Sequence, residues 1–437
     1  MSRPTAGLCF ASCAIDAACL GALATRARET GRVIERDGLA IFGLGTAAEL
    51  KLSGGLSDPA ALERAVADLG SIVPFAGEHD LAQVGPTWGE DQAPVPIALG
   101  ALAFDRRADG VLVVPELTVV SSPNRPALAI VVASAARVGS ILTTITHAKL
   151  EATSFHGELA PPDEFRLASA RPHHDFLRRV AAALVEIASG RLDKVVLARE
   201  VTVHANRPFR QADLVSRLRA LHPSCTTFAI DGFIGASPEL LISRRGAHIA
   251  SKPLAGTAPR SGDPDSDRRA EAALLSSAKE RSEHRVVVET IAAGLSPVAE
   301  HLEVPEEPLI FELRNVSHLG TLMTGTLARR DGAYPTSLDL VGLLHPTPAV
   351  AGTPADLALD YLSKLEEIDR DRYAGPLGWV DARGDGEWHL GIRSAIVSAS
   401  SARLFAGVGI VADSDPASEL AETQLKLQAF LAAAVRP

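Results

Sequence analysis

Three apolar segments near the C-terminus decide the fold: Pro376-Leu-Gly-Trp-Val-Asp381, Glu387-Trp-His-Leu-Gly-Ile-Arg-Ser-Ala-Ile-Val397 and Arg403-Leu-Phe-Ala-Gly-Val-Gly-Ile-Val411. The first two are joined by the turn sequence Ala382-Arg-Gly-Asp-Gly386. Apolar segments that are joined by such short turns are typical of strands that pair antiparallel with their sequence neighbours. The pattern therefore predicts an antiparallel meander.

Further strands and helices are expected upstream and downstream of this meander. The expected strands are Ala127–Ala135, Lys194–His204, Thr226–Ile234, Leu240–Arg244, His248–Lys252 and Thr321–Ala328. The expected helices are Pro59–Leu69, Asp175–Ser189, Asp267–Leu295, about Pro354–Leu365, and Pro416–Val435. Groups of strands separated by helices predict an α+β fold, with a large, mainly antiparallel core of two packed sheets surrounded by helices. We expect a single large domain over residues 1–437, in which residues 1–160 complete the core.

The composition narrows the class of protein. The chain has 437 residues, a net charge of −10 and 46% hydrophobic residues, which indicates a globular protein with a substantial core. The negative charge argues against nucleic acid or an anionic membrane as a partner. No apolar run is long enough to predict a transmembrane helix. The four cysteines are too sparse for a disulfide scaffold and have no metal-binding spacing, so a cytoplasmic location is expected.

The expected C-terminal helix carries two acids and a base on one face. Asp415 is a suitable N-cap, and Glu419, Glu422 and Lys426 follow at spacings of three and four residues. The glycines Gly407 and Gly409 precede the helix and allow close approach of the backbone to a ligand. These features suggest a site for a charged small molecule and a hard cation. The alternative is a solvated helix face with a simple Glu–Lys pair.

A second acid pair occurs in another expected helix. In Ala278-Lys-Glu-Arg-Ser-Glu-His284, Glu280 and Glu283 are three residues apart. Two helices that each present two carboxylates could close around one Mg²⁺, which accepts a few carboxylates and keeps several waters. Two unrelated surface pairs are the alternative.

Two further residues have the chemistry of a base and an acid. Lys194 opens a very apolar strand, and a partly desolvated lysine can act as a general base near neutral pH. Glu239 follows a Ser-Pro turn before another strand, where burial would keep a carboxyl protonated as a general acid. A lysine whose ammonium group reaches solvent, and a serine that caps a turn, are the ordinary alternatives.

Two other segments contain groups suited to binding an anion. Gly256 and Thr257, in Pro253-Leu-Ala-Gly-Thr257, could offer backbone N–H groups and a hydroxyl to a carboxylate, or form an ordinary bend. Arg393 interrupts an apolar segment and calls for an anionic partner, because arginine is rarely buried unpaired.

In their order along the chain, these segments closely resemble the chorismate-binding enzymes, and within them the isochorismate synthases of siderophore and menaquinone biosynthesis. The resemblance covers about residues 170–435 and includes His345-Pro-Thr-Pro-Ala349 and Tyr373-Ala-Gly-Pro-Leu-Gly-Trp379. It implies a Mg²⁺ cofactor, chorismate as substrate, a catalytic region over residues 170–435, and a monomer.

The resemblance also implies roles for individual residues. Lys194 matches the lysine that activates water for attack at C2 of chorismate, and Glu239 matches the acid that protonates the departing C4 hydroxyl. Glu283 and Glu422 match the Mg²⁺ ligands, with Glu280 and Glu419 acting through water. The matching substrate-binding positions are Gly256, Thr257, His318, Ala349, Tyr373, Arg393, Gly407, Gly409 and Lys426.

Single positions separate the activities within this family. Aminating synthases typically have glutamine where this chain has Lys194, and salicylate synthases, which go on to release pyruvate, usually have threonine where it has Ala349. Both positions favour an isochorismate synthase. A salicylate synthase is the nearest alternative, followed by an aminating synthase subunit and a non-catalytic chorismate-binding protein. One departure is Ala351-Gly352, where isochorismate synthases commonly have two glycines, and this departure puts the fine shape of the pocket in doubt.

Overall fold

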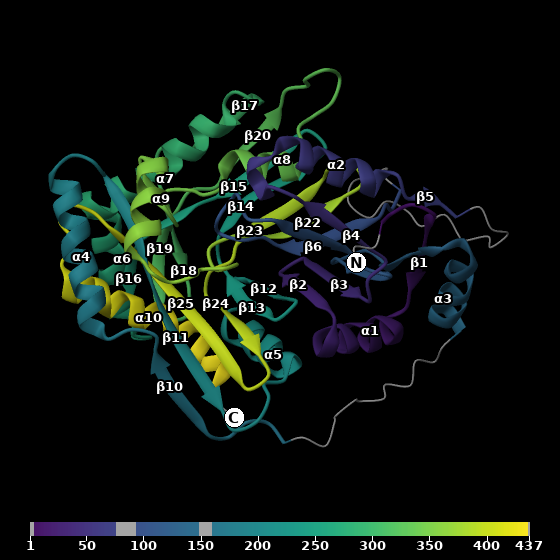
Figure 1. Ribbon diagram of the computed structural model, residues 1–437, viewed down its shortest axis with the longest axis horizontal. Coiled ribbons are helices and arrows are strands. Elements are labelled where there is room, and N and C mark those ends of the chain that lie inside the picture. Colours follow the sequence, from purple (N-terminus) through teal and green to yellow (C-terminus); the bar gives the residue numbers. More distant parts are fainter. Residues whose placement is uncertain (1–3, 76–92, 148–159, 436–437) are drawn as a thin grey trace.

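The computed structural model describes residues 4–75, 93–147 and 160–435. In this part of the chain, helices surround two large sheets and one small sheet (Figure 1). Almost all strand pairs are antiparallel; β1 and β5 pair parallel. The predicted α+β fold with large, mainly antiparallel sheets is confirmed, and the small third sheet is an addition to the two that were expected.

The largest sheet has 13 strands among the described residues and runs through both halves of the chain. In spatial order its strands are β10 (Phe165–Ser169), β11 (Lys194–Ala205), β25 (Ser401–Ile410), β24 (Ser394–Ser398), β13 (Phe233–Ser237), β12 (Thr226–Ile230), β2 (Arg32–Arg36), β3 (Leu39–Leu44), β8 (Leu117–Ser121), β9 (Ala127–Ser134), β1 (Leu8–Ile15) and β5 (Val73–Pro74), with β21 (Gly352–Thr353) paired to β11.

The other two sheets are smaller. The second has nine strands in the described ranges, in the order β17 (Ala299–Glu303), β20 (Met323–Leu327), β15 (His248–Lys252), β14 (Leu240–Arg245), β23 (Gly386–Leu390), β22 (Pro376–Asp381), β6 (Ile97–Ala101), β7 (Gly110–Val114) and β4 (Ala48–Leu52). The third consists of β16 (Leu254–Pro259), β19 (Val316–Gly320) and β18 (Leu309–Glu312).

The two large sheets pack against each other through apolar side chains. Ile34 and Ile41 of the 13-stranded sheet lie in one buried cluster with Ile97, Leu99 and Trp379 of the nine-stranded sheet. Each of these side chains is nearly inaccessible to water, so the cluster contributes to stability mainly through the hydrophobic effect. Because it contains residues from both halves of the chain, it joins them into one core.

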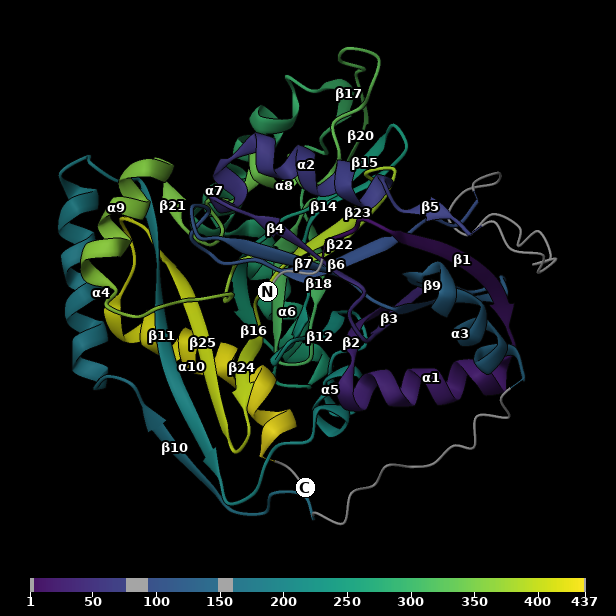
Figure 2. The ribbon, with the colours of Figure 1, turned by 45° about the vertical axis from the view of Figure 1, so that its right-hand side comes forward.

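Helices cover the outer faces of both large sheets (Figure 2). Those that pack on the 13-stranded sheet are α1 (Ala17–Thr30), α3 (Ala135–His147), α4 (His173–Ala188), α5 (Gln211–Leu221), α9 (Ala355–Leu365) and α10 (Pro416–Ala434). Those beside the nine-stranded and three-stranded sheets are α2 (Pro59–Gly70), α6 (Pro264–Ser276), α7 (Ala278–Leu295) and α8 (Ser337–Leu344), with a short 3₁₀ turn at Gly55–Ser57. No helix in the described ranges is both long enough and apolar enough to span a membrane.

Three of the expected elements are divided in the structure. The strand expected over residues 226–234 is the hairpin of β12 and β13, which turns at Asp231 and Gly232, both with positive φ. The helix expected over residues 267–295 is α6 followed by α7, because the Ser277 side chain accepts a hydrogen bond from the Glu280 amide and caps a new helix. The strand expected over residues 387–397 is divided around Arg393, which has a φ of 53°, into β23 of the nine-stranded sheet and β24 of the 13-stranded sheet. The predicted meander of three strands in one sheet is therefore wrong.

Candidate active site

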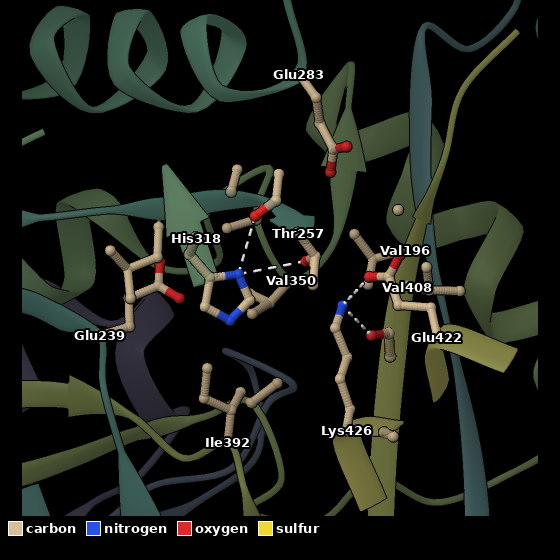
Figure 3. Close-up of a pocket in the computed structure, with 18 of the residues that line it drawn as sticks. Val196, Glu239, Thr257, Glu283, His318, Val350, Ile392, Val408, Glu422 and Lys426 are labelled. Carbon is tan, nitrogen blue, oxygen red and sulfur yellow. Dashed lines mark hydrogen bonds and ion pairs between the residues drawn. The ribbon is translucent and has the colours of Figure 1, made fainter. Parts of the chain in front are cut away.

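The predicted site residues all line one cavity, although they come from distant parts of the sequence. Its walls are the paired strands β11 and β25, the helices α7 and α10, the strands β16 and β19, and the turn that precedes β22. In Figure 3, Glu239 lies on the opposite side of the cavity from Glu422 and Lys426, and Glu283 enters from above. The fold therefore brings the candidate base, acid, cation ligands and anion-binding groups together.

The candidate base, Lys194, is the first residue of β11 and is only 3% exposed. Its Nζ donates a hydrogen bond of 2.7 Å to Glu283 Oε1, so that it forms an ion pair with one of the candidate metal ligands. A Cβ atom at Gly409, on the neighbouring β25, would lie 2.6 Å from this Glu283 oxygen and 2.7 Å from Lys194 Cε. Glycine at this position leaves the space that the pair occupies.

The candidate acid, Glu239, lies between β13 and β14 and is 3% exposed. Burial raises the pKa of its carboxyl to about 7, because the charged form loses hydration. A backbone hydrogen bond from Leu254 and the charges of Lys194 and Arg393 favour the ionised form but are weaker. The side chain of Ser237 accepts a hydrogen bond of 3.3 Å from the Glu239 amide, so this serine caps the turn. A buried carboxyl that is protonated near neutral pH can donate a proton.

Four carboxylates face the cavity from two helices, as the sequence predicts. Burial, with repulsion from Glu283 and Glu422, raises the pKa of Glu280. The pKa of Glu419 is raised by burial and by the same two carboxylates. Burial also acts to raise the pKa of Glu422, but Lys426, at 2.6 Å, and the more distant Arg393 together outweigh it, and the net shift is downward. The helices thus concentrate negative charge that nearby cations offset.

The fit of these carboxylates to a metal depends on their present partners. In the described part of the chain, no group of three or more His, Cys, Asp or Glu side chains already stands in a metal-binding arrangement. Lys194 holds Glu283, Lys426 holds Glu422, and Lys279 lies 3.8 Å from Glu419. The donor set itself, all carboxylate oxygen, suits a hard cation such as Mg²⁺. The residues fit the ion chemically once the lysines release them.

Arg393 is oriented by a chain of hydrogen bonds through His318. The Arg393 Nη2 group lies 2.9 Å from His318 Nε2, and His318 Nδ1 lies 2.9 Å from the Gly256 carbonyl oxygen. Because a guanidinium only donates, His318 must accept at Nε2 and carry its hydrogen on Nδ1. Burial, together with the charges of Arg393 and Lys426, lowers the pKa of His318 to about 3 and keeps the ring neutral. His318 therefore positions a cation and is not itself a charged ligand.

The glycine–threonine turn lines the cavity and binds one of the predicted acids. Gly256 has a φ of 72°, which glycine adopts without strain. The amide of Thr257 donates a hydrogen bond to Glu280 Oε2 at 3.1 Å, and the Thr257 hydroxyl lies 3.3 Å from His318 Nδ1. The amide was expected to offer a hydrogen bond to a carboxylate, and in the structure the carboxylate that accepts it is Glu280 of the protein itself. The turn positions Glu280 and His318.

The remaining predicted residues form the wall next to β25. Lys426 Nζ donates to the Gly407 carbonyl at 3.0 Å and pairs with Glu422, as the dashed lines in Figure 3 show. Tyr373 stacks on Phe405, with ring centroids 5.1 Å apart, and burial raises the pKa of its hydroxyl. A Cβ at Gly407 would approach the Tyr373 hydroxyl to 3.1 Å, so the ring fits closely over the glycine.

Two charged residues of the cavity were not predicted. Lys279 precedes Glu280, and Arg370 precedes Tyr373 by three residues. Lys279 is next to the predicted acid Glu280 in the sequence, and this position could have indicated that it lies near the site. Arg370 lies in the charged segment Asp369-Arg-Asp-Arg372, which has the appearance of a surface loop, and nothing in its local sequence indicates a buried position.

Known proteins resemble the chain over most of its length. The chorismate binding enzyme family matches residues 35–435. The isochorismate synthase DhbC of Bacillus subtilis (strain 168) is 37% identical over 349 residues, which cover 77% of this chain and 80% of that protein. The crystal structure of DhbC from Bacillus anthracis is 33% identical, with a TM-score of 0.77, and the match covers 95% of this chain and 98% of the other.

A more distant structure confirms the architecture alone. The menaquinone-specific isochorismate synthase MenF from Escherichia coli is 24% identical, with a TM-score of 0.77, and the match covers 100% of this chain and 96% of the other. At 24% identity this comparison shows a shared fold only. The family match and the similarity to the Bacillus proteins also show that the sequences are related. The chain belongs to the family of chorismate-binding enzymes.

Proposed function

We propose that this chain is an isochorismate synthase, an isomerase that converts chorismate to isochorismate with Mg²⁺ as its cofactor. The observation that carries the proposal is the presence in one cavity of a buried lysine and a buried glutamate, whose pKa burial raises to about 7, beside the cationic groups of Arg393 and Lys426. A base and an acid held in one cavity suit a reaction in which water enters and a hydroxyl leaves. The names of the similar proteins support the same reaction.

The proposed reaction assigns one proton transfer to each residue. Lys194 accepts a proton from the water that attacks C2, while Glu239 donates its proton to the C4 hydroxyl, which leaves as water. Water is gained and lost once, so the product is an isomer of the substrate. Lys194 can accept a proton only when neutral, and the reaction therefore requires its ion pair with Glu283 to open. After turnover, one proton must return from Lys194 to Glu239.

Chorismate is a dicarboxylate, and the cavity offers cations for it. Arg393 and Lys426 are proposed to bind one carboxylate and to hold the ring between Lys194 and Glu239. Glu283 and Glu422 would hold Mg²⁺, with Glu280 and Glu419 acting through water, and the ion would supply positive charge for a substrate carboxylate.

The test is to incubate the purified protein with chorismate and Mg²⁺ and to separate the products by chromatography. Isochorismate is expected without any nitrogen source, and addition of a chelator should abolish its formation. Lys194→Ala and Glu239→Gln should each abolish turnover and leave chorismate binding measurable by calorimetry. Release of salicylate and pyruvate would contradict the proposal, and so would full activity of either variant.

We further propose that the protein acts as a monomer in the cytoplasm. All four cysteines lie in the described residues, where each is buried and none forms a disulfide. Buried thiols that remain reduced suit a reducing compartment. Elution as a monomer in size-exclusion chromatography is the expected result.

A further inference from the structure

A buried ion pair, outside the proposed chemistry, lies in one wall of the cavity, which Arg370 lines and Glu366 supports from behind. Glu366 follows α9, Arg370 comes one helical turn later, and each is 4% exposed. The guanidinium and the carboxylate meet through two parallel hydrogen bonds, Nε to Oε2 and Nη2 to Oε1, both of 2.6 Å. This bidentate geometry fixes the orientation of both groups.

The pair binds the backbone of two separate walls of the cavity. Arg370 donates from Nη2 to the Val196 carbonyl at 2.7 Å and from Nη1 to the Val350 carbonyl at 2.8 Å. Glu366 Oε1 accepts from the Ala198 amide at 2.6 Å. Val196 and Ala198 belong to β11, whereas Val350 belongs to the loop after α8.

These backbone groups are close neighbours of the proposed catalytic and substrate-binding residues. Val196 is two residues from Lys194, and Val350 follows Ala349 directly. The Arg370 carbonyl accepts a hydrogen bond of 2.8 Å from the Tyr373 amide. Arg370 therefore also contacts a third wall of the cavity, the one that carries Tyr373. The pair therefore connects the elements that carry the base and two of the substrate-binding positions.

The pair is in turn held from behind. Arg179 of α4 donates to the Glu366 carbonyl at 2.8 Å, and the Arg370 guanidinium lies 4.2 Å from the centre of the Phe104 ring. Burial of two charges costs hydration energy, and a well-packed apolar pair would often be as stable. A guanidinium, however, presents several N–H groups in one rigid plane, so that it can bind a carboxylate and two carbonyls from different elements at once.

We propose that Arg370, oriented by Glu366, is a positioning residue for the reaction: it fixes the Lys194 segment of β11 relative to the Ala349 and Tyr373 walls. This inference rests on the proposed function. Misplacement of a catalytic group by about 1 Å can reduce the rate about a hundredfold, so loss of this connection should reduce kcat more than it changes KM.

The test compares variants that separate positioning from folding. Arg370→Met alone would leave Glu366 buried and unpaired and is expected to unfold more easily. The double variant Glu366→Leu/Arg370→Met removes both charges and should keep the fold, while losing the bonds to Val196 and Val350. Its kcat for isochorismate formation should fall at least about tenfold, whereas its KM should change less than about threefold.

Arg370→Lys and Arg403→Met provide the matched comparisons. Lysine keeps the charge for Glu366 but lacks the planar fork, so Arg370→Lys should retain the melting temperature and also show a reduced kcat. Arg403 forms a bidentate pair with Glu200 on the same strand β11, at 2.9 and 3.0 Å, and does not line the cavity. Arg403→Met should have the kcat of the original protein.

The outcomes together separate a failure of the positioning role from a failure of the proposed function. A folded double variant with unchanged kcat would overturn the positioning role, as would Arg403→Met reducing kcat as much as Arg370→Lys does. Absence of isochorismate formation by the original protein would contradict the proposed function and, with it, the inference. Original activity with an unaffected double variant would contradict the inference alone.

Discussion

At the scale of single residues, Glu239 makes the proposed activity dependent on pH. Burial raises its pKa to about 7, and a general acid must be protonated to act. We expect kcat/KM to decrease as the pH rises above about 7, because deprotonation removes the proton donor from the free enzyme. Initial rates of chorismate conversion, measured from about pH 5.5 to about pH 9, would test this. A rate that does not fall up to the upper limit would contradict the assignment of Glu239.

The same pKa shift makes the folding stability of the protein depend on pH. The carboxyl has a pKa of 4.5 in the unfolded chain and about 7 in the folded one, so the folded state binds more protons between these values. Stability therefore falls as the pH rises through this window, by about 3 kcal/mol in all. We expect Glu239→Gln to raise the melting temperature relative to the original protein at pH 8. The advantage should shrink toward pH 4.5, and a constant difference at all pH values would contradict burial of a titrating carboxyl.

Gly409 is a residue where one methyl group should be enough to disturb the site. A Cβ would overlap Glu283 Oε1 and Lys194 Cε, so Gly409→Ala should displace the ion pair and reduce isochorismate formation by at least about tenfold. Glycine 21, in α1, has nothing within 4 Å of its Cβ position and serves as the control, because Gly21→Ala should leave the rate unchanged. Far-UV circular dichroism of both variants should show the original fold. Full activity of Gly409→Ala would show that the contact is not required.

At the scale of elements, α7 and α10 should respond to Mg²⁺ together. Their carboxylates repel one another, and an ion that binds only the folded state raises the unfolding temperature. We expect Mg²⁺ to increase the melting temperature, and Glu422→Gln to remove most of the increase. Glu289 lies on α7 but is exposed and outside the cavity, so Glu289→Gln should keep the full increase. An equal response of the two variants would contradict the proposed ligand role of Glu422.

The same elements show what could be predicted from the sequence. The helix α10 was predicted almost to its ends, because Asp415 caps it and Pro416 suits its first turn. The division of α6 from α7 was missed although Ser277 and Glu280 have the three-residue spacing of a helix-capping motif, because helix-forming residues flank this segment on both sides.

The candidate site was predictable where residue type and local motif carry the signal, and not where distant groups meet. The lysines, glutamates and glycines of the cavity are all in recognisable motifs. The pairing of Lys194 with Glu283, the use of the Thr257 amide by Glu280, and the binding of Val196 and Val350 by Arg370 depend on contacts between distant segments. Backbone acceptors of this kind leave no trace in local sequence, so only the folded structure reveals them.

At the scale of the whole molecule, both large sheets are completed by strands from the two halves of the chain. The first half contributes β2, which pairs with β12, and β6, which pairs with β22. Without the first half, two strand edges and the apolar surface around Trp379 would be exposed to water. We therefore expect residues 160–437 alone to aggregate or to remain unfolded, although they contain the candidate site.

Tryptophan fluorescence and far-UV circular dichroism would test this dependence during unfolding in urea. Because Trp379 packs with Ile34 and Ile97 of the first half, and Trp388 is also fully buried, we expect both signals of the complete chain to change in one coincident transition. The fragment should show the red-shifted emission of exposed tryptophan, and co-expression of residues 1–159 as a separate chain should restore the buried emission. A fragment that folds alone with the emission of the complete protein would mean that the second half has a sufficient core of its own, and that the first half only covers it.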